Sequence, residues 1–101
     1  MNSKWFKPES IKVSETAIKK QIKYYLQYRG WFIFHVLQGV GSYKGVSDFI
    51  AIKAGKVLFI EVKTMAGKQS ADQLQFEANI KSHGGIYLVA RSIEDIKELA
   101  G

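Results

Sequence analysis

Residues 47–63 read SDFIAIKAGKVLFIEVK, which predicts two β-strands joined by a tight turn. Apolar, aromatic and β-branched side chains dominate residues 49–52 and 57–63, as is typical of strands. Between them, Lys53-Ala54-Gly55-Lys56 has the length and composition of a hairpin turn. We therefore expect an antiparallel pair of strands at the centre of the fold.

The hairpin would bring two acidic residues together. Side chains alternate between faces along a strand, so Glu61 and Lys63 share one face while Ile60 and Val62 point into the core. If the chain reverses within the turn, position 48 pairs close to position 61. The carboxylates of Asp48 and Glu61 would then lie side by side across the two strands.

Two neighbouring ionised carboxylates repel each other and need a cation. Mg²⁺ or Mn²⁺ suits them, because these ions prefer oxygen ligands and retain waters for chemistry. Such an ion lowers the pKa of a bound water and offsets charge that builds up on a phosphate. Lys63 could orient the attacking water, help to deprotonate it, or stabilise the phosphate charge, and the sequence leaves these roles open.

A competing interpretation is an ordinary surface pair. An acid and a base two residues apart are common on the solvent face of a strand, and the Glu61-x-Lys63 triplet alone favours that interpretation. Asp48 lies across a short hairpin and after a glycine-containing loop. Its presence weakens the surface-pair interpretation without excluding it.

The remaining segments predict helices around this hairpin. Ser14 is a plausible helix N-cap, and apolar residues recur at helical spacing after it until Gly30. The expected elements are a helix over 15–29, a strand over 31–37, strands over 49–52 and 57–63, a helix over 71–82, a strand over 86–90 buried on both faces, and a helix opened by Ser92 paired with Asp95 and ending near Leu99. This α-β-β-β-α-β-α order predicts an α/β fold with a mixed sheet of about four strands, its last strand parallel to its neighbour.

Composition narrows the class of protein. A chain of 101 residues suits a single domain, and 15 Lys and Arg against 9 Asp and Glu, a formal net charge of +6, favour a polyanionic partner such as nucleic acid. The absence of cysteine excludes disulfides and zinc–thiolate sites. No stretch has the length and apolar character of a signal peptide or a membrane span, so we expect a cytoplasmic protein with no membrane partner.

Three short motifs follow one another along the chain: residues 45–48 (Gly-Val-Ser-Asp), residues 60–63 (Ile-Glu-Val-Lys) and residues 70–76 (Ser-Ala-Asp-Gln-Leu-Gln-Phe). Together with residues 84–92 they resemble the virus-type replication-repair nuclease domain (VRR-NUC) of the PD-(D/E)XK nuclease superfamily. The resemblance extends from about Glu15 to Ser92. It implies one VRR-NUC-like domain over residues 1–101 with a restriction-endonuclease-like core. Ser47 stands where the family pattern has proline, which we expect to change local rigidity rather than activity.

The resemblance also implies roles for individual residues. Asp48 and Glu61 would be metal ligands, with the backbone carbonyl of Val62 also facing the ion. Lys63 would be the catalytic lysine. Gln73 would support the site from the start of its helix by touching the lysine or a water.

Two further assignments have competitors. Glu15 matches a helix-borne glutamate that contacts the metal through water, although the helix dipole also favours a glutamate in a first turn. Gln73 could instead be an ordinary surface residue, and Gln75 is close enough to compete for its role.

As a whole, the resemblance implies a Mg²⁺- or Mn²⁺-dependent DNA endonuclease. Stand-alone members of the family, from phages and bacteria, resemble Holliday-junction resolvases and act as homodimers. Branched or four-way DNA, a homodimer and the cytoplasm of a bacterial or phage-infected cell are therefore expected. Tyr43, Lys44 and Lys68 are candidate DNA contacts, and Trp5 and Phe6 could cover an apolar patch or a subunit interface. The alternatives are a non-catalytic nucleic-acid-binding module with the same fold and a basic scaffold protein.

Overall fold

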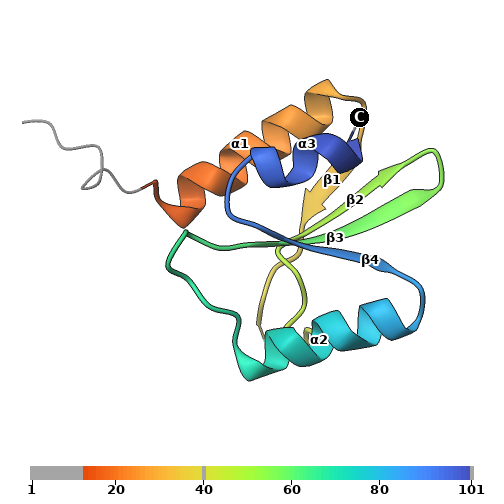
Figure 1. Cartoon of the computed structure of the whole chain (residues 1–101). Coiled ribbons are helices and arrows are strands. Elements are labelled where there is room, and N and C mark those ends of the chain that lie inside the picture. The colour runs from red at the N-terminus through yellow and green to blue at the C-terminus, as the bar shows by residue number, and fades with distance from the viewer. Residues whose placement is uncertain (1–12, 40, 101) are drawn as a thin grey trace, which may run out of the picture.

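A four-stranded sheet with helices on both sides organises the chain (Figure 1). The structure is a computed structural model that describes residues 13–39 and 41–100, so the expectations for Trp5 and Phe6 lie outside the described residues. Its elements are α1 (Glu15–Tyr28), β1 (Phe32–His35), β2 (Phe49–Lys53), β3 (Lys56–Val62), α2 (Ala71–Ser82), β4 (Ile86–Ala90) and α3 (Glu94–Ala100). The predicted element order and α/β class are confirmed.

The strands follow the order β1-β2-β3-β4. The first three are mutually antiparallel, and β4 joins β3 in parallel after the chain crosses over through α2, as predicted. In the β2–β3 hairpin Phe49 pairs with Ile60, so one further step places Asp48 opposite Glu61. On the other side of β2, the backbone N–H of Val36 donates to the Asp48 carbonyl over 2.7 Å and extends the β1–β2 pairing by one step. The predicted register is correct.

The two faces of the sheet carry different cores. Helices α1 and α3 lie on one face and α2 lies on the other (Figure 1). The larger core, on the α1 side, is formed by Ile18, Ile22, Leu26, Trp31, Ile33, Phe49, Ala51, Leu58, Ile60, Val62, Ala90 and Ile96. A smaller cluster of Val46, Phe76 and Tyr87 lies under α2. The α2 side of the sheet, which includes the Asp48–Glu61 positions, is thus the more thinly covered face.

Three details differ from the sequence predictions. Strand β1 starts one residue later than expected, because the Trp31 N–H still bonds back to the Leu26 carbonyl at the helix end, and it ends at His35 rather than at Leu37. Strand β4 is an edge strand with three of its five residues only partly buried, so full burial on both faces was wrong. The Ser92–Asp95 capping pair was also wrong, since the Asp95 carboxylate accepts from the Arg91 N–H at 2.8 Å.

The N-cap of α1 is confirmed: Ser14 Oγ accepts from the Ala17 N–H at 3.1 Å. Within residues 13–39 and 41–100, none of the helices is long and apolar enough to cross a bilayer.

Candidate active site

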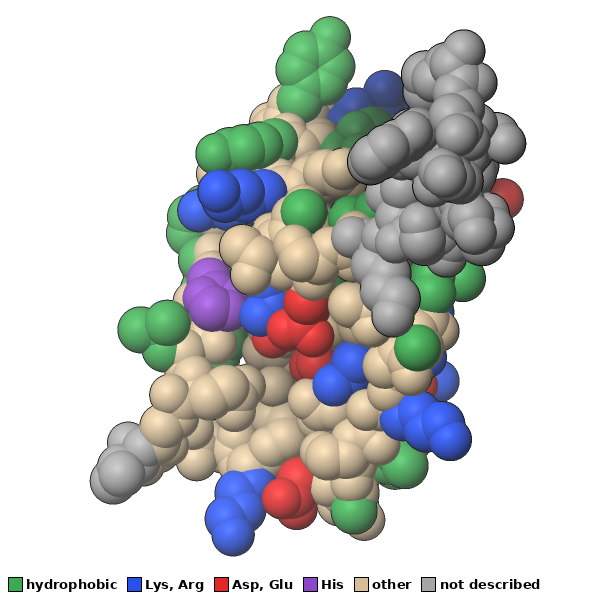
Figure 2. All heavy atoms as spheres, turned by 90° about the vertical axis from the view of Figure 1, so that its left-hand side faces the viewer, with side chains coloured by type: hydrophobic (Ala, Val, Ile, Leu, Met, Phe, Trp, Pro, Cys, Tyr) green, Lys and Arg blue, Asp and Glu red, His purple; other side chains and the backbone are tan. Residues whose placement is uncertain are grey.

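Two carboxylates are buried together at one end of the sheet. Asp48 is 8% exposed and Glu61 is 2% exposed. The interpretation of Glu61 as half of a solvent-face pair is therefore wrong for this fold. In Figure 2, acidic side chains gather near the centre of one face of the molecule with Lys or Arg side chains beside them. Because burying charge is costly unless it is compensated, this arrangement needs partners for each oxygen.

One oxygen of Asp48 is bound to the protein backbone. Asp48 Oδ2 accepts from the Val62 N–H at 2.7 Å, which ties the carboxylate across the end of the β2–β3 pair. Asp48 Oδ1 faces the Lys19 ammonium instead, at 3.3 Å. The neighbouring Ser47 is fully buried, and its hydroxyl donates to the Phe49 carbonyl at 3.1 Å. Serine thus makes its own local restraint where the family pattern has proline.

Glu61 has one satisfied oxygen and one without a partner. Its Oε2 accepts from Gln73 Nε2 at 3.0 Å and lies 3.6 Å from the Lys63 ammonium. Its Oε1 is buried and has no hydrogen-bond partner among the described residues. Burial, followed by the negative charge of Asp48, raises the pKa of Glu61 to about 8, against the opposing effect of Lys63. Among the described residues, Glu61 Oε1 is thus a buried acceptor to which no group donates.

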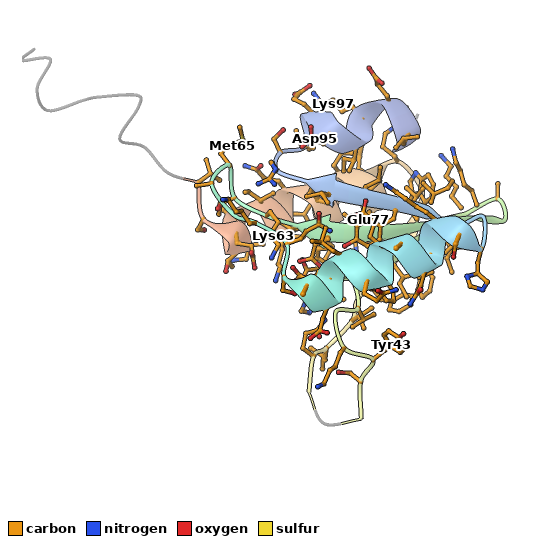
Figure 3. The ribbon with its side chains drawn as sticks, turned by 60° about the horizontal axis from the view of Figure 1, so that its bottom comes forward. Tyr43, Lys63, Met65, Glu77, Asp95 and Lys97 are labelled. Atoms are coloured by element: carbon orange, nitrogen blue, oxygen red, sulfur yellow. The ribbon has the colours of Figure 1, made fainter. Side chains whose placement is uncertain are left out.

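Lys63 follows directly on β3 and lies near the first turn of α2 (Figure 3). Its side chain is 15% exposed. The loop that follows it is held by Arg91, whose Nη1 donates to the carbonyls of Thr64 at 2.6 Å and Gly67 at 2.7 Å. The sequence analysis did not identify this clamp, because an arginine after a strand carries no local signal for a partner 24 or 27 residues away.

The start of α2 supplies the second support of Glu61. Ser70 and Gln73 form a capping box, in which Gln73 Oε1 accepts from the Ser70 N–H at 2.9 Å. This bond aims the Gln73 amide group at Glu61, rather than at the lysine or a water as expected. Gln75 donates to Asn79 Oδ1 at 3.1 Å and is exposed, so Gln73 rather than Gln75 contacts Glu61.

Gly45 explains how the loop before Asp48 meets this helix. The residue has a φ of +78°, and a Cβ there would overlap the backbone carbonyl of Asp72. The loop that carries Asp48 therefore packs directly against the turn that carries Gln73. Only glycine combines this backbone conformation with such a close approach.

Helix α1 contributes Glu15 and Lys19. The Lys19 ammonium lies 3.2 Å from Glu15 Oε2 and 3.3 Å from Asp48 Oδ1, so it bridges the two acids. Burial lowers the pKa of Lys19, but the charges of Asp48 and Glu15 outweigh it and leave the pKa above its usual value. The sequence analysis identified Glu15 but not Lys19. The i, i+4 spacing of the two was available as a signal, whereas the contact with Asp48 was not.

The three candidate DNA contacts lie outside the carboxylate cluster. The Tyr43 ring packs on Phe76 with centroids 5.8 Å apart, and its hydroxyl accepts from Asn79 at 3.3 Å. It lies on the loop beside α2 (Figure 3). Lys44 and Lys68 are exposed. Their contact with DNA stays a prediction.

The donor chemistry of the site fits a hard divalent cation. In the part of the chain that the structure describes, neither Asp48 Oδ1 nor Glu61 Oε1 accepts from a backbone or amide donor, and oxygen is the ligand type that Mg²⁺ and Mn²⁺ prefer. Within the described residues, no group of three or more His, Cys, Asp or Glu is placed to hold a metal. An ion would thus rely on two carboxylates, water and backbone oxygen, for which Val62 remains the predicted donor.

No protein-family model and no curated protein matches the chain. A solved structure described as a VRR_NUC domain is similar over 84% of this chain and 91% of its own, with a TM-score of 0.73 and 22% sequence identity. The predicted restriction-endonuclease-like core is thereby confirmed, and the chain has the fold of a VRR_NUC domain.

Proposed function

We propose that this protein is a Mg²⁺- or Mn²⁺-dependent endodeoxyribonuclease that hydrolyses phosphodiester bonds, acting on branched DNA as a homodimer. The observation that carries the proposal is the convergence of Asp48 and Glu61. They come from the adjacent β2 and β3 segments and are buried together, and among the described residues one oxygen of each has no backbone or amide donor. A buried pair of this kind is costly unless a cation joins it.

Different residues of the site would serve different steps of hydrolysis. Asp48 and Glu61 would hold the divalent ion, which would lower the pKa of a bound water and offset charge on the phosphate. Lys63 keeps its ammonium beside Glu61 at 3.6 Å, from where it can bond to the attacking water or to a phosphate oxygen. Gln73 orients Glu61 from α2, and the Val62 N–H orients Asp48 from β3.

The charge of the protein supports a nucleic-acid substrate. A formal net charge of +6 attracts phosphates, and Lys44 and Lys68 are free to contact them at the surface. Tyr43, a residue that is 61% exposed, adds an aromatic ring that could pack against a sugar or a base. Selectivity for branched DNA follows from the VRR-NUC resemblance and from the pairing of two sites in a dimer.

An apolar area on the α2 side of the sheet suits that pairing. It comprises six side chains on β1, β2 and β3 that share this face and are exposed or only partly buried: Phe32, Phe34, Ile50, Ile52, Val57 and Phe59. We call this area the open sheet face. None of the six is charged, so it matches a like apolar surface better than a polyanion. A second copy would cover it by a two-fold contact of the same patch.

The open sheet face continues through Phe59 into a groove of about 620 Å³ beside α2. The groove is lined by Tyr43, Phe59, Phe76, Asn79, Ile80, His83 and Gly85. Contact between two copies could thus extend from the sheet onto α2.

Cleavage of a labelled four-way junction and of a linear duplex of the same sequence tests the function. With Mn²⁺, the wild type should cut the junction faster than the duplex, and EDTA should stop it. Asp48→Asn and Glu61→Gln should each lower the rate by about 100-fold or more while junction binding persists. Glu98→Gln, which changes an exposed acid on α3, is the matched control and should cut normally.

The same assay separates the alternatives. Junction binding without cleavage by the wild type under every metal condition would favour the non-catalytic module. Absence of binding would favour a scaffold protein.

A further inference from the structure

Lys19 reaches from α1 into the carboxylate pair. Its ammonium lies 3.3 Å from Asp48 Oδ1 and 3.2 Å from Glu15 Oε2, and its side chain is only 25% exposed. Glu15 lies one helical turn earlier, so the ammonium is restrained from its own helix and from the sheet at once. Lys20, the next residue on α1, is exposed.

The oxygen that Lys19 contacts is the one an ion would need. Asp48 Oδ2 already accepts from the Val62 N–H at 2.7 Å. Lys19 therefore faces the remaining oxygen of Asp48. Across the pair, Glu61 Oε2 is engaged by Gln73 and Lys63, and Glu61 Oε1 has no partner among the described residues. Of the two oxygens open to a cation, one is already next to a positive charge.

The positive charge of the Lys19 ammonium repels a divalent cation that approaches Asp48 Oδ1. At about 4 Å, unit charges near a protein surface interact strongly enough to shift binding equilibria, although partial exposure screens the effect. A dication approaching Asp48 Oδ1 must displace the ammonium or tolerate its repulsion. Without the dication, the same ammonium compensates the buried Asp48.

We propose that Lys19 is the counter-ion of Asp48 in the metal-free protein. Because its ammonium occupies Asp48 Oδ1, it weakens the binding of a divalent cation there. The inference rests on the proposed function, because it takes Asp48 and Glu61 as the metal ligands. It gives the protein a site that stays assembled without metal and releases Asp48 when an ion is bound.

Mn²⁺ binding without DNA tests the inference, with the signal of free Mn²⁺ in electron paramagnetic resonance as readout. The chain offers matched variants: Lys19→Met removes the ammonium, Lys19→Arg keeps the charge, and Lys20→Met removes one charge from the adjacent exposed position. Lys19→Met should bind Mn²⁺ about three- to tenfold more tightly than the wild type. Lys19→Arg and Lys20→Met should stay within about twofold of it.

Thermal unfolding in EDTA supplies a second readout. Lys19→Met should melt below both the wild type and Lys20→Met, because Asp48 loses its counter-ion. Mn²⁺ should raise the melting temperature of Lys19→Met by more than it raises that of the wild type.

The outcomes are distinguishable. Equal or weaker Mn²⁺ binding by folded Lys19→Met, with the wild type binding normally, overturns the role of Lys19 and leaves the nuclease proposal intact. Tighter binding by Lys20→Met to the same degree overturns it as well, since net charge then explains the gain. Failure of the wild type to bind Mn²⁺ more tightly than Asp48→Asn overturns the metal site and the role of Lys19 together.

Discussion

Gln73 donates from its Nε2 to Glu61 Oε2 over 3.0 Å, while its own Oε1 accepts from the backbone of Ser70. A single side chain thus closes the capping box of α2 and supports the buried carboxylate of β3. Helix initiation and the site are therefore linked through one residue.

Gln73→Glu separates these two tasks. Glutamate at this position keeps a capping box but replaces the donor to Glu61 with a second negative charge. We expect a folded protein with junction cleavage lowered about 10- to 100-fold, as is common when a support of a metal ligand is lost. Gln75→Glu, on the exposed face of the same helix, should cleave like the wild type. Equal rates for the two variants would contradict this assignment.

Glu61→Gln should change how stability depends on pH when metal is absent. The pKa of Glu61 is raised from 4.5 to about 8 by burial and by Asp48. The stability that its neutral form confers is complete below about pH 4.5 and is lost as the pH rises through about 8. The uncharged glutamine escapes this loss.

Melting temperatures in EDTA between pH 5 and 9 measure the difference. Wild type and Glu61→Gln should melt at similar temperatures near pH 5, and the variant should melt higher by about 5 °C or more at pH 9. Glu98→Gln controls for loss of one carboxylate and should show no such trend. A difference that does not depend on pH would argue against the raised pKa.

Gly45→Ala should disturb the contact between the loop before Asp48 and the start of α2. Two costs combine here, a left-handed backbone and an overlap of the new Cβ with the Asp72 carbonyl. Gly41→Ala isolates the first cost, because Gly41 has a φ of +90° and open space around its Cβ position. We expect about 1 kcal/mol of destabilisation for Gly41→Ala and about 2 to 4 kcal/mol for Gly45→Ala, measured by urea unfolding. Equal values would mean that the overlap is relieved without cost.

Phe32→Lys tests the open sheet face as the dimer contact. Phe32 is 65% exposed and its ring lies 5.5 Å from that of Phe34, so the change places a charge in the patch without emptying the core. We expect the dimer to dissociate at least about tenfold more readily, measured by analytical ultracentrifugation. Tyr28→Lys, at an 88% exposed aromatic residue on α1, is the control and should remain dimeric. A wild type that is monomeric at 100 µM would refute the dimer itself.

Most of the architecture could be predicted from local patterns. The helix after Ser14, the hairpin around residues 53–56 and the helix after Ser70 each have start or turn signals within a few residues. The pairing of Asp48 with Glu61 also followed, because a short turn determines the register of the strands it joins. The edge position of β4 could not be predicted in this way, since it depends on the order of the strands in the sheet.

The sequence by itself determined which chemical groups are present and, through the hairpin, that two carboxylates and a lysine lie near one another. Tertiary structure alone decided that Asp48 and Glu61 are buried, that Lys19 bridges Glu15 to Asp48, that Gln73 holds Glu61, and that Arg91 holds the loop after Lys63. The physical reason is the distance along the sequence over which each kind of interaction acts. Alternation and turns act over a few residues, whereas burial and these side-chain contacts arise only when helices from both ends of the chain pack against the sheet.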